Sequence, residues 1–342
     1  TLQRFLEVIR QPYLIADENV TISASIGYTI YPLDATEPET LLRHADQAMY
    51  QSKLSGGSHI HRFDMDLDRQ YRGLRQDRER IEAALPNGEF CLYYQPKVNM
   101  HLGQVVSMEA LIRWQHPELG LRSPPSFLPL IENTDFSIAL GDWVIRQAIA
   151  QLASWQSQGL DLSVSINVSP RHIIQHDFTQ RLMQILSEHP AVLPQKVELE
   201  ITETAAIEDV ASVVRTMNSC KALGVSFALD DFGVGYSSLT YLRRLPVSVI
   251  KVDRSFVRDM LVDSNDLAMV AGIISLGRDF HCMVVAEGVE TAEHGLQLLK
   301  MDCQVAQGYF IAHPMPADKV VSWLQAYKPH ESWLQLGQHY TI

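Results

Sequence analysis

The chain has 342 residues, which is enough for one large domain and a smaller one. Hydrophobic residues make up 46% and charged residues 20% of it, as in soluble globular proteins, and no apolar run approaches the roughly 18 residues of a membrane span. The net charge of −12 argues against duplex nucleic acid as a partner, because no strong basic field is available to attract its phosphates.

The cysteines are widely separated and show no metal-ligand spacing. They are typical of buried or free thiols in a reducing compartment: Cys91, Cys220, Cys282 and Cys303. The sequence opens with Thr1 and without a signal peptide, which indicates a piece of a longer protein. We therefore expect a cytoplasmic location and no membrane contact within these residues, although the full-length protein could carry a membrane anchor upstream.

Residues 1–63 contain the elements expected at the end of an α+β domain. An amphipathic helix is predicted over Leu2–Ile9, and a strand over Val20–Ile30, where β-branched residues are frequent. After a turn, apolar residues at helical spacing predict a helix over Glu39–Leu54, which Gly56-Gly57 ends.

Two runs in this segment carry a family resemblance. They read S-A-S-I-G-Y-T-I-Y-P at 23–32 and L-L-R-H-A-D-Q-A-M-Y-Q-S-K at 41–53, and they resemble the C-terminal part of diguanylate cyclase (GGDEF) domains. The signature turn of that family belongs upstream of this segment, and Gly56-Gly57 is followed by Ser58-His59, so it is not that turn. The resemblance therefore implies no cyclase activity for this chain.

Residues 64–86 form a charged stretch with apolar residues at three- and four-residue steps, which predicts a helix. Pro86-Asn87-Gly88 ends it. We interpret it as a solvated connecting helix. The alternative is a signalling helix that pairs with its twin in a dimer.

From Glu89 onward, short apolar strands alternate with helices. The predicted strands are Phe90–Gln95, Val105–Arg113, Leu162–Asn167, Lys196–Glu203, Val225–Asp231, Val249–Asp253, Met283–Glu287 and Cys303–Gln307. The predicted helices are Pro125–Thr134, Ile138–Gln158, Pro170–His189, Ile207–Leu223, Leu239–Leu245, Val262–Phe280 and Thr291–Met301. This alternation predicts an α/β fold, a (β/α)8 barrel of the TIM type. The first two strands are joined without a helix, which predicts a hairpin and one antiparallel strand; a doubly wound open sheet is the alternative.

Polar residues gather at the C-terminal ends of these strands, where barrel enzymes keep their catalytic groups. They are Asn167, Glu200, Asp230, Asp231, Lys251, Asp253, Glu287 and Gln307, with Glu109 and Arg113 on the second strand. Several carboxylates in one low-dielectric mouth repel one another, and hard cations such as Mg²⁺ or Mn²⁺ are the usual remedy. No His or Cys stands at these ends, which argues against zinc.

The second strand places an acid and a base on one face, because Glu109, Leu111 and Arg113 alternate along it. Such a pair on a buried wall needs a partner, and metal or phosphate would serve. An internal ion pair, or an edge strand with one wet face, is the alternative.

Asp230 and Asp231 are neighbours, so both can reach one site only where the backbone leaves the strand. Phe232-Gly233-Val234-Gly235 supplies that break, with glycines free to take positive φ. Two acids beside such a turn are suited to bind a pair of metal ions, with one of the acids bridging the two ions. The alternative is an Asx-type turn without a metal.

Glu200 and Glu203 have opposite strand parity, so they should not share a role. Glu200 is the better ligand, and Glu203 is better as a support for the loop after Asp231. Lys251 is either a cation near the attacking water or phosphoryl oxygens, or a structural partner of the acids.

A second resemblance covers residues 66 to 328. Its motifs are Tyr94-Gln95-Pro96, E-A-L-I-R-W at 109–114, Asn167-Val168-Ser169, Glu200-Ile201-Thr202-Glu203, Asp230-Asp231-Phe232-Gly233, Ile250-Lys251-Val252-Asp253, Ala286-Glu287-Gly288-Val289-Glu290 and Gln307-Gly308-Tyr309. In this order they resemble the EAL-domain family of phosphodiesterases specific for cyclic di-GMP. The resemblance implies a barrel, two Mg²⁺ or Mn²⁺ ions per active site, hydrolysis of cyclic di-GMP to linear pGpG, and a homodimer.

The resemblance also implies roles for single residues. Glu109, Asn167, Glu200 and Asp230 would hold one metal, and Asp230 would bridge to a second completed by Asp231 and Glu287. Lys251 would contact the nucleophilic water and Gln307 would position it. Gln95, Arg113 and Asp253 would bind substrate, and Glu203 would fix the loop at 231–237. Val234 departs from the small or hydroxylated residues common in the family.

The expected organisation is a GGDEF-like C-terminal part at 1–63, a linker helix at 64–86, an EAL barrel at 87–330 and a tail at 331–342. Two other functions remain open. A catalytically weak receptor module would bind cyclic di-GMP without cleaving it. A barrel enzyme acting on carbon acids with one Mg²⁺ would use the carboxylates but not the pair Asp230-Asp231.

Overall fold

A computed structural model describes residues 2–15, 18–20, 22–54, 59–203, 210–235 and 242–338. The chain divides into two compact units, Thr1–Arg80 and Ile81–Ile342. No helix within the described ranges has both the length and the apolar character needed to cross a bilayer.

The first unit is a small α+β arrangement. It contains α1 (Leu2–Ile9), a hairpin of β1 (Tyr13–Ile15) and β2 (Glu18–Val20), and α2 (Pro38–Leu54) beside the parallel pair β3 (Ile26–Tyr28) and β4 (Ile60–Arg62). The two predicted helices are confirmed. The predicted strand over Val20–Ile30 is wrong in extent, because β3 is only as long as its partner β4. The Gly56-Gly57 stop lies outside the described residues.

Helix α3 (Met65–Ala84) confirms the predicted helix. Its last turn is not solvated: Ile81 and Ala84 are 1% and 0% exposed and belong to the core of the second unit.

The second unit is a closed barrel, which confirms the predicted fold class and rules out the open sheet. Its strands are β5 (Phe90–Asn99), β6 (Gln104–His116), β8 (Val164–Asn167), β9 (Val197–Thr202), β10 (Ser226–Phe232), β11 (Val249–Val252), β12 (Met283–Ala286) and β13 (Val305–Ala306). The order runs β5-β13-β12-β11-β10-β9-β8-β6, and β6 pairs again with β5. The hairpin is also confirmed, since β5 is antiparallel to both β6 and β13. Two short strands add to the sheet: β7 (Gly120–Arg122) pairs antiparallel with β6, and β14 (Met315–Pro316) pairs antiparallel with β5.

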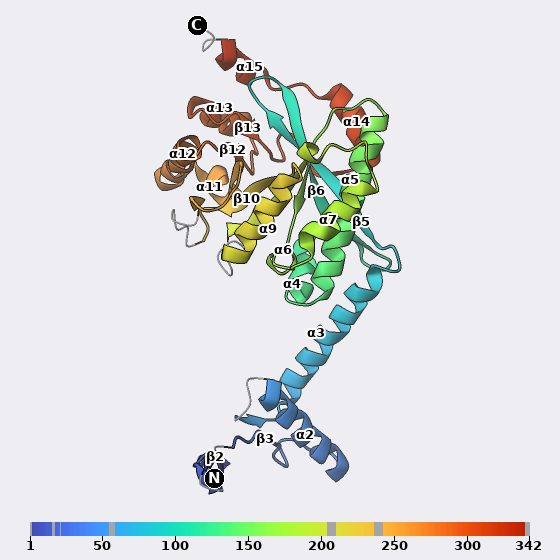
Figure 1. The fold of residues 1–342 in the computed structure, drawn as a ribbon, viewed down its shortest axis with the longest axis vertical. Coiled ribbons are helices and arrows are strands. Elements are labelled where there is room, and N and C mark those ends of the chain that lie inside the picture. The colour runs from blue at the N-terminus through green and yellow to red at the C-terminus, as the bar shows by residue number, and fades with distance from the viewer. Residues whose placement is uncertain are drawn as a thin grey trace. The chain divides into compact units, whose positions relative to one another are not determined.

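Helices surround the strands (Figure 1). They are η1 (Pro124–Ser126), α4 (Leu128–Ile131), α5 (Phe136–Ser157), α6 (Pro170–Ile173), α7 (Phe178–Ser187), η2 (Pro194–Lys196), α9 (Val210–Ala222), α11 (Arg254–Asp259), α12 (Ser264–Asp279), α13 (Ala292–Lys300), α14 (Ala317–Ala326) and α15 (Glu331–Gln338). In the stretch expected to be a tail, α15 buries Trp333, whose Nε1 donates to the Ala292 oxygen at 2.9 Å.

Some helix predictions need correction. The single helix predicted over Pro170–His189 is α6 and α7, because buried His172 contacts Asp142 of α5 at 2.9 Å and the chain turns after α6 has docked there. The helix predicted from Val262 begins at Ser264, where Asp263 caps it, and the short helix α11 before it was not predicted. In the described part of the helix predicted over Leu239–Leu245, Leu242 is helical and residues 243–245 form a turn and a bend. Residues 239–241 and the start of the helix predicted from Ile207 lie outside the described residues.

The barrel interior is arranged in layers, because every second residue of a strand faces the same side. One layer holds Lys97, Ser107, Ser165, Glu198, Ala228, Val249, Val285 and Val305, and the last four form their own buried apolar cluster. Two residues further toward the C-terminal ends of the parallel strands lies a polar layer: Gln95, Glu109, Asn167, Glu200, Asp230, Lys251, Glu287 and Gln307. The fold therefore brings each of these polar residues to one end of the barrel.

Candidate active site

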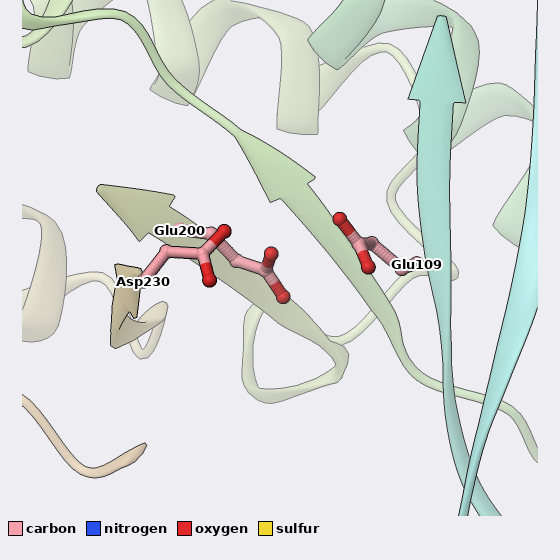
Figure 2. A group of neighbouring side chains, drawn as sticks. All are labelled: Glu109, Glu200 and Asp230. Carbon is pink, nitrogen blue, oxygen red and sulfur yellow. The ribbon is translucent and has the colours of Figure 1, made fainter. Parts of the chain in front are cut away.

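Three buried carboxylates meet at the C-terminal end of the barrel. Glu109 comes from β6, Glu200 from β9 and Asp230 from β10, and one oxygen of each lies within 4.8 Å of the others. Figure 2 shows the three side chains directed toward a common space from separate strands. All three are less than a tenth exposed, so their mutual repulsion is poorly screened by water.

A second group of acids shares Asp230 with the first. It comprises Asp230, Asp231 and Glu287, again with ligand atoms within 4.8 Å of one another. Asp231 reaches the site because β10 is irregular between Leu229 and Phe232, and Asp231 itself takes a left-handed φ of 53°. The backbone therefore leaves the strand at Asp231, a residue type that tolerates this backbone region, and Gly233 takes the predicted positive φ, 102°.

The Lys251 ammonium lies among these acids. Its Nζ is 2.5 Å from Glu287 Oε1, 2.6 Å from Glu200 Oε2, 3.1 Å from Asp230 Oδ2 and 3.7 Å from Glu109 Oε2. Burial disfavours its charge, but the surrounding carboxylates hold its pKa well above the ordinary value. Lys251 is therefore a fixed positive charge in the middle of the site.

One ammonium does not neutralise this many acids. Burial raises the pKa of Glu287 to about 8, with Asp230 and Glu109 adding to the shift against the effect of Lys251. Burial also raises the pKa of Asp231 to about 6, helped by the charge of Asp230, and it raises the pKa of Glu109. The site thus carries more negative charge than its own cations balance, which is the electrostatic setting of a divalent-cation site.

Glu200 differs from the other acids because two lysines bind it. Lys97 Nζ lies 2.5 Å from Glu200 Oε1 and 3.0 Å from Glu198 Oε1, while Lys251 binds Glu200 Oε2. Burial raises the pKa of Glu200, but the two ammonium groups outweigh burial and bring this pKa below its ordinary value. Glu200 is therefore held in its charged form.

Amide side chains orient Glu109. Asn167 Nδ2 donates to Glu109 Oε1 at 2.8 Å, and Gln307 Nε2 donates to Glu109 Oε2 at 2.6 Å and to Gln95 Oε1 at 2.8 Å. Gln95 Nε2 in turn donates to the Ala312 oxygen at 2.9 Å. Within the described part of the chain, the buried Gln307 Oε1 has no hydrogen-bond partner. It is an acceptor available to a water or ligand.

A cavity of about 850 Å³ opens over this cluster, a size suited to a small-molecule ligand. Its lining includes Gln95, Glu109, Leu111, Pro125, Asp230, Asp231, Val234, Asp253, Arg254, Ser255, Arg258, Glu287, Gly288, Glu290, Gln307, Gly308 and Tyr309. The predicted site residues Glu109, Asp230, Asp231, Asp253, Glu287, Gln95 and Gln307 therefore share one cavity, while Lys251 and Glu200 lie buried against it.

Two predicted residues are not among those that line this cavity. Arg113 is not among its lining residues; its Nη1 donates to the Ile112 oxygen at 2.8 Å, and its guanidinium lies 5.6 Å from the centre of the Tyr93 ring. Glu203 Oε2 accepts the Gly233 N–H at 3.3 Å and so contacts the segment after Asp231. Residues 236–241, the rest of that loop, lie outside the described residues.

Sequence reasoning missed Lys97, Arg254 and Arg258. Lys97 is two residues from Gln95 on the same strand, and strand parity alone could have placed it in the barrel. Arg254 and Arg258 follow Asp253 on α11, a helix that was not predicted. Asp253 caps that helix by accepting the Ser255 N–H at 2.9 Å.

A closed α/β barrel with acids clustered at its C-terminal mouth defines the structural class of the second unit, and comparison with known proteins identifies the family. The EAL domain model matches residues 78–314, and that of the diguanylate cyclase, GGDEF domain, matches residues 1–59. The chain belongs to the EAL domain family, with a GGDEF segment at its N-terminal end.

Two relatives from Pseudomonas aeruginosa match almost the whole chain. The bifunctional diguanylate cyclase/cyclic di-GMP phosphodiesterase MucR is 36% identical over 321 residues, which cover 94% of this chain and 47% of MucR. The cyclic di-GMP phosphodiesterase NbdA is 34% identical over 327 residues, covering 95% of this chain and 42% of NbdA. The chain thus spans less than half the length of either relative.

Solved structures agree with this assignment. The MucR phosphodiesterase in complex with c-di-GMP has a TM-score of 0.69 and 37% identity, covering 72% of this chain and 99% of that one. The EAL enzyme Bd1971, in its cAMP- and cyclic-di-GMP-bound form, has a TM-score of 0.72 and 32% identity, covering 85% of this chain and 77% of that one.

Proposed function

We propose that this chain hydrolyses cyclic di-GMP to linear 5′-pGpG and so acts in bacterial second-messenger signalling. The observation that carries the proposal is the pair of carboxylate groups that share Asp230 at the C-terminal mouth of the barrel. The names of MucR, NbdA and the MucR phosphodiesterase complex support the substrate.

The donor set fits a pair of Mg²⁺ or Mn²⁺ ions. Its carboxylate oxygens are the ligands that hard divalent cations prefer, and the raised pKa values of Glu287, Asp231 and Glu109 indicate negative charge that lacks a counterion. We assign one ion to Glu109, Asn167, Glu200 and Asp230, and the other to Asp230, Asp231 and Glu287. When bound, such ions lower the pKa of water and offset charge on phosphate oxygens.

The buried cation and amide of the site orient the reacting groups. We assign Lys251 to hold the attacking water or a phosphoryl oxygen, because its ammonium is fixed among the acids and deprotonates with difficulty. Gln307 holds Glu109 through Nε2, and its Oε1 lacks a described partner and can accept a hydrogen bond from the water. The water adds to phosphorus, the bond from phosphorus to a ribose 3′ oxygen breaks, and that oxygen leaves with a proton.

Substrate binding is assigned to Gln95, Arg113 and Asp253, and Glu203 is assigned to fix the loop after Asp231. Arg254 and Arg258 add positive charge to the cavity wall. A cyclic dinucleotide carries two phosphates, and these cannot approach a cluster of carboxylates unless cations lie between them. The arrangement therefore supports substrate binding only when the acids hold their ions.

The test is to incubate the chain with cyclic di-GMP and Mg²⁺ or Mn²⁺ and to separate the products by chromatography. We expect linear pGpG, no product after chelation, and no turnover by Glu109→Ala. Binding of cyclic di-GMP without any cleavage would contradict the proposal and favour a receptor module. Robust turnover by a metal-loaded Glu109→Ala protein would contradict the assignment of Glu109.

We propose a GGDEF-like part at 1–63, a linker helix at 64–86, the EAL barrel at 87–330 and a tail at 331–342, in a cytoplasmic homodimer. Light scattering over a range of concentrations tests the dimer, since a mass that stays at that of one chain would contradict it.

A further inference from the structure

The interior layer that lies beneath the polar layer, farther from the C-terminal ends of the parallel strands, is unusual on one side of the barrel. Barrel interiors are commonly filled by bulky branched residues, and Val249, Val285 and Val305 follow that rule here. On the opposite strands the same layer holds an ion pair instead, formed by buried Lys97 of β5 and partly buried Glu198 of β9. Burying the Lys97 ammonium is costly, and an apolar side chain of similar size would often be at least as stable. The ion pair is therefore a weak candidate for a purely stabilising role.

Lys97 also contacts the layer above. Its side chain is 2% exposed, and its Nζ binds Glu200 Oε1 at 2.5 Å as well as Glu198 Oε1 at 3.0 Å. Glu198, two residues before Glu200, anchors the ammonium from the side away from the cavity. Lys97 is thus clamped between two carboxylates of the same strand, and only one of them belongs to the acid cluster.

The two oxygens of Glu200 face different surroundings as a result. Oε1 is bound by Lys97, outside the acid cluster. Oε2 accepts a hydrogen bond from Lys251 at 2.6 Å inside the acid cluster, where Lys251 also contacts Glu109, Asp230 and Glu287. Glu200 can therefore offer Oε2 to a cation at the centre of the cluster while Oε1 remains engaged.

We propose that Lys97 is a positioning residue that restricts Glu200 to one-oxygen ligation and so selects Mg²⁺ or Mn²⁺ over Ca²⁺. The inference rests on the proposed function for the existence of the ions. Mg²⁺ demands compact octahedral coordination, whereas Ca²⁺ takes six to eight oxygens and readily uses both oxygens of a carboxylate. A carboxylate with one oxygen withheld serves the smaller ion and deprives the larger one of a ligand.

The experiment measures the dissociation constants of Mg²⁺ and Ca²⁺ by calorimetry on the full chain, without substrate. Lys97→Met removes the ammonium and keeps the length of the side chain, so Glu200 Oε1 becomes available. We expect the ratio of the Ca²⁺ constant to the Mg²⁺ constant to fall by at least about tenfold. A ratio unchanged from wild type, with both affinities altered in parallel, would overturn the proposal.

Two further variants keep the test decisive. Lys97→Met leaves the partly buried Glu198 without its cation. The double variant Lys97→Met/Glu198→Gln, which removes one charge of each sign, serves if the single variant does not fold. It should show the same fall in the ratio. Glu198→Gln alone retains Lys97 on Glu200, and its ratio should stay at the wild-type value; a tenfold fall there would contradict the role of Lys97.

The outcome separates the two proposals. If the wild-type chain binds Mg²⁺ and releases pGpG but Lys97→Met keeps the wild-type ratio, the Lys97 proposal fails and the proposed function stands. If the wild-type chain binds no divalent cation, the proposed function fails and the Lys97 proposal with it.

Discussion

Some side chains of the site are oriented by hydrogen bonds from neighbouring side chains. Gln307 is one such neighbour, because its Nε2 donates to both Glu109 and Gln95. Loss of a group that orients a metal ligand commonly costs metal affinity or activity. We expect Gln307→Ala to lower Mn²⁺ affinity or the rate of pGpG release by about 10- to 100-fold, measured by calorimetry and by product analysis.

A matched control lies three residues earlier. Gln304 is exposed, and its Oε1 accepts a hydrogen bond from Asn99 Nδ2 at 3.4 Å. Gln304→Ala should therefore leave both quantities near the wild-type values. An equal loss in the two variants would show that Gln307 acts through general stability and not through Glu109.

At the scale of single residues, the sequence predicted which residues form the site better than it predicted the contacts that they make. The acids could be assigned to one site because each lies within or at the end of a predicted strand, and strand ends meet at one rim of a barrel. The bulge at Asp231 could not be foreseen, since it depends on a register shift between β10 and β11. Lys97 was missed for a related reason: its partners Glu198 and Glu200 lie about a hundred residues away and meet it only when β5 closes the barrel.

At the scale of secondary-structure elements, close backbone packing fixes the position of the segment that follows β13. A Cβ on Gly308 would lie 2.2 Å from the Val289 backbone oxygen, so no larger residue fits without displacing the chain beside Gln307. Overpacking of this kind costs about 1–3 kcal/mol. We expect Gly308→Ala to lose that much stability in urea unfolding and to lose pGpG release through displacement of Gln307.

Gly272 on α12 provides the comparison. A Cβ there meets nothing within 4 Å, and alanine favours a helix interior over glycine by about 1 kcal/mol. Gly272→Ala should therefore be neutral or stabilising, with unchanged activity. A Gly308→Ala protein as stable and active as Gly272→Ala would contradict the packing described for Val289.

The elements themselves were largely predictable where a local pattern specifies them. The β5–β6 hairpin followed from a connection too short for a helix, and α5, α12 and α13 from long apolar periodicity. The break between α6 and α7 was not predictable, because it follows from the contact of His172 with Asp142 on another helix. The shortness of β3 likewise depends on its partner β4 and not on its own β-branched residues.

Across the whole molecule, the last turn of α3 contributes to the barrel core although it precedes the first barrel strand. Ile81 is 1% exposed, whereas Leu74 on the same helix is 46% exposed. Truncating a buried isoleucine to alanine costs about 2–5 kcal/mol, and most exposed positions change by less than about 0.5 kcal/mol. We expect Ile81→Ala to destabilise the chain by that larger amount and Leu74→Ala to leave its free energy of unfolding nearly unchanged, as measured in urea.

Equal effects of the two substitutions would contradict the inclusion of Ile81 in the barrel core. The sequence placed both residues on one charged helix with the same periodicity, so it could not distinguish them. Closure of the barrel makes the difference, because it creates the core cluster that Ile81 and Ala84 join.

The claim on which the proposed function depends is that acids from separate strands hold two cations that share Asp230. The most direct test is to count the Mn²⁺ ions bound per chain by equilibrium dialysis of the metal-free protein. Two ions per chain are expected, held by the two carboxylate groups. A single ion or none, in protein that remains folded, would contradict the shared site.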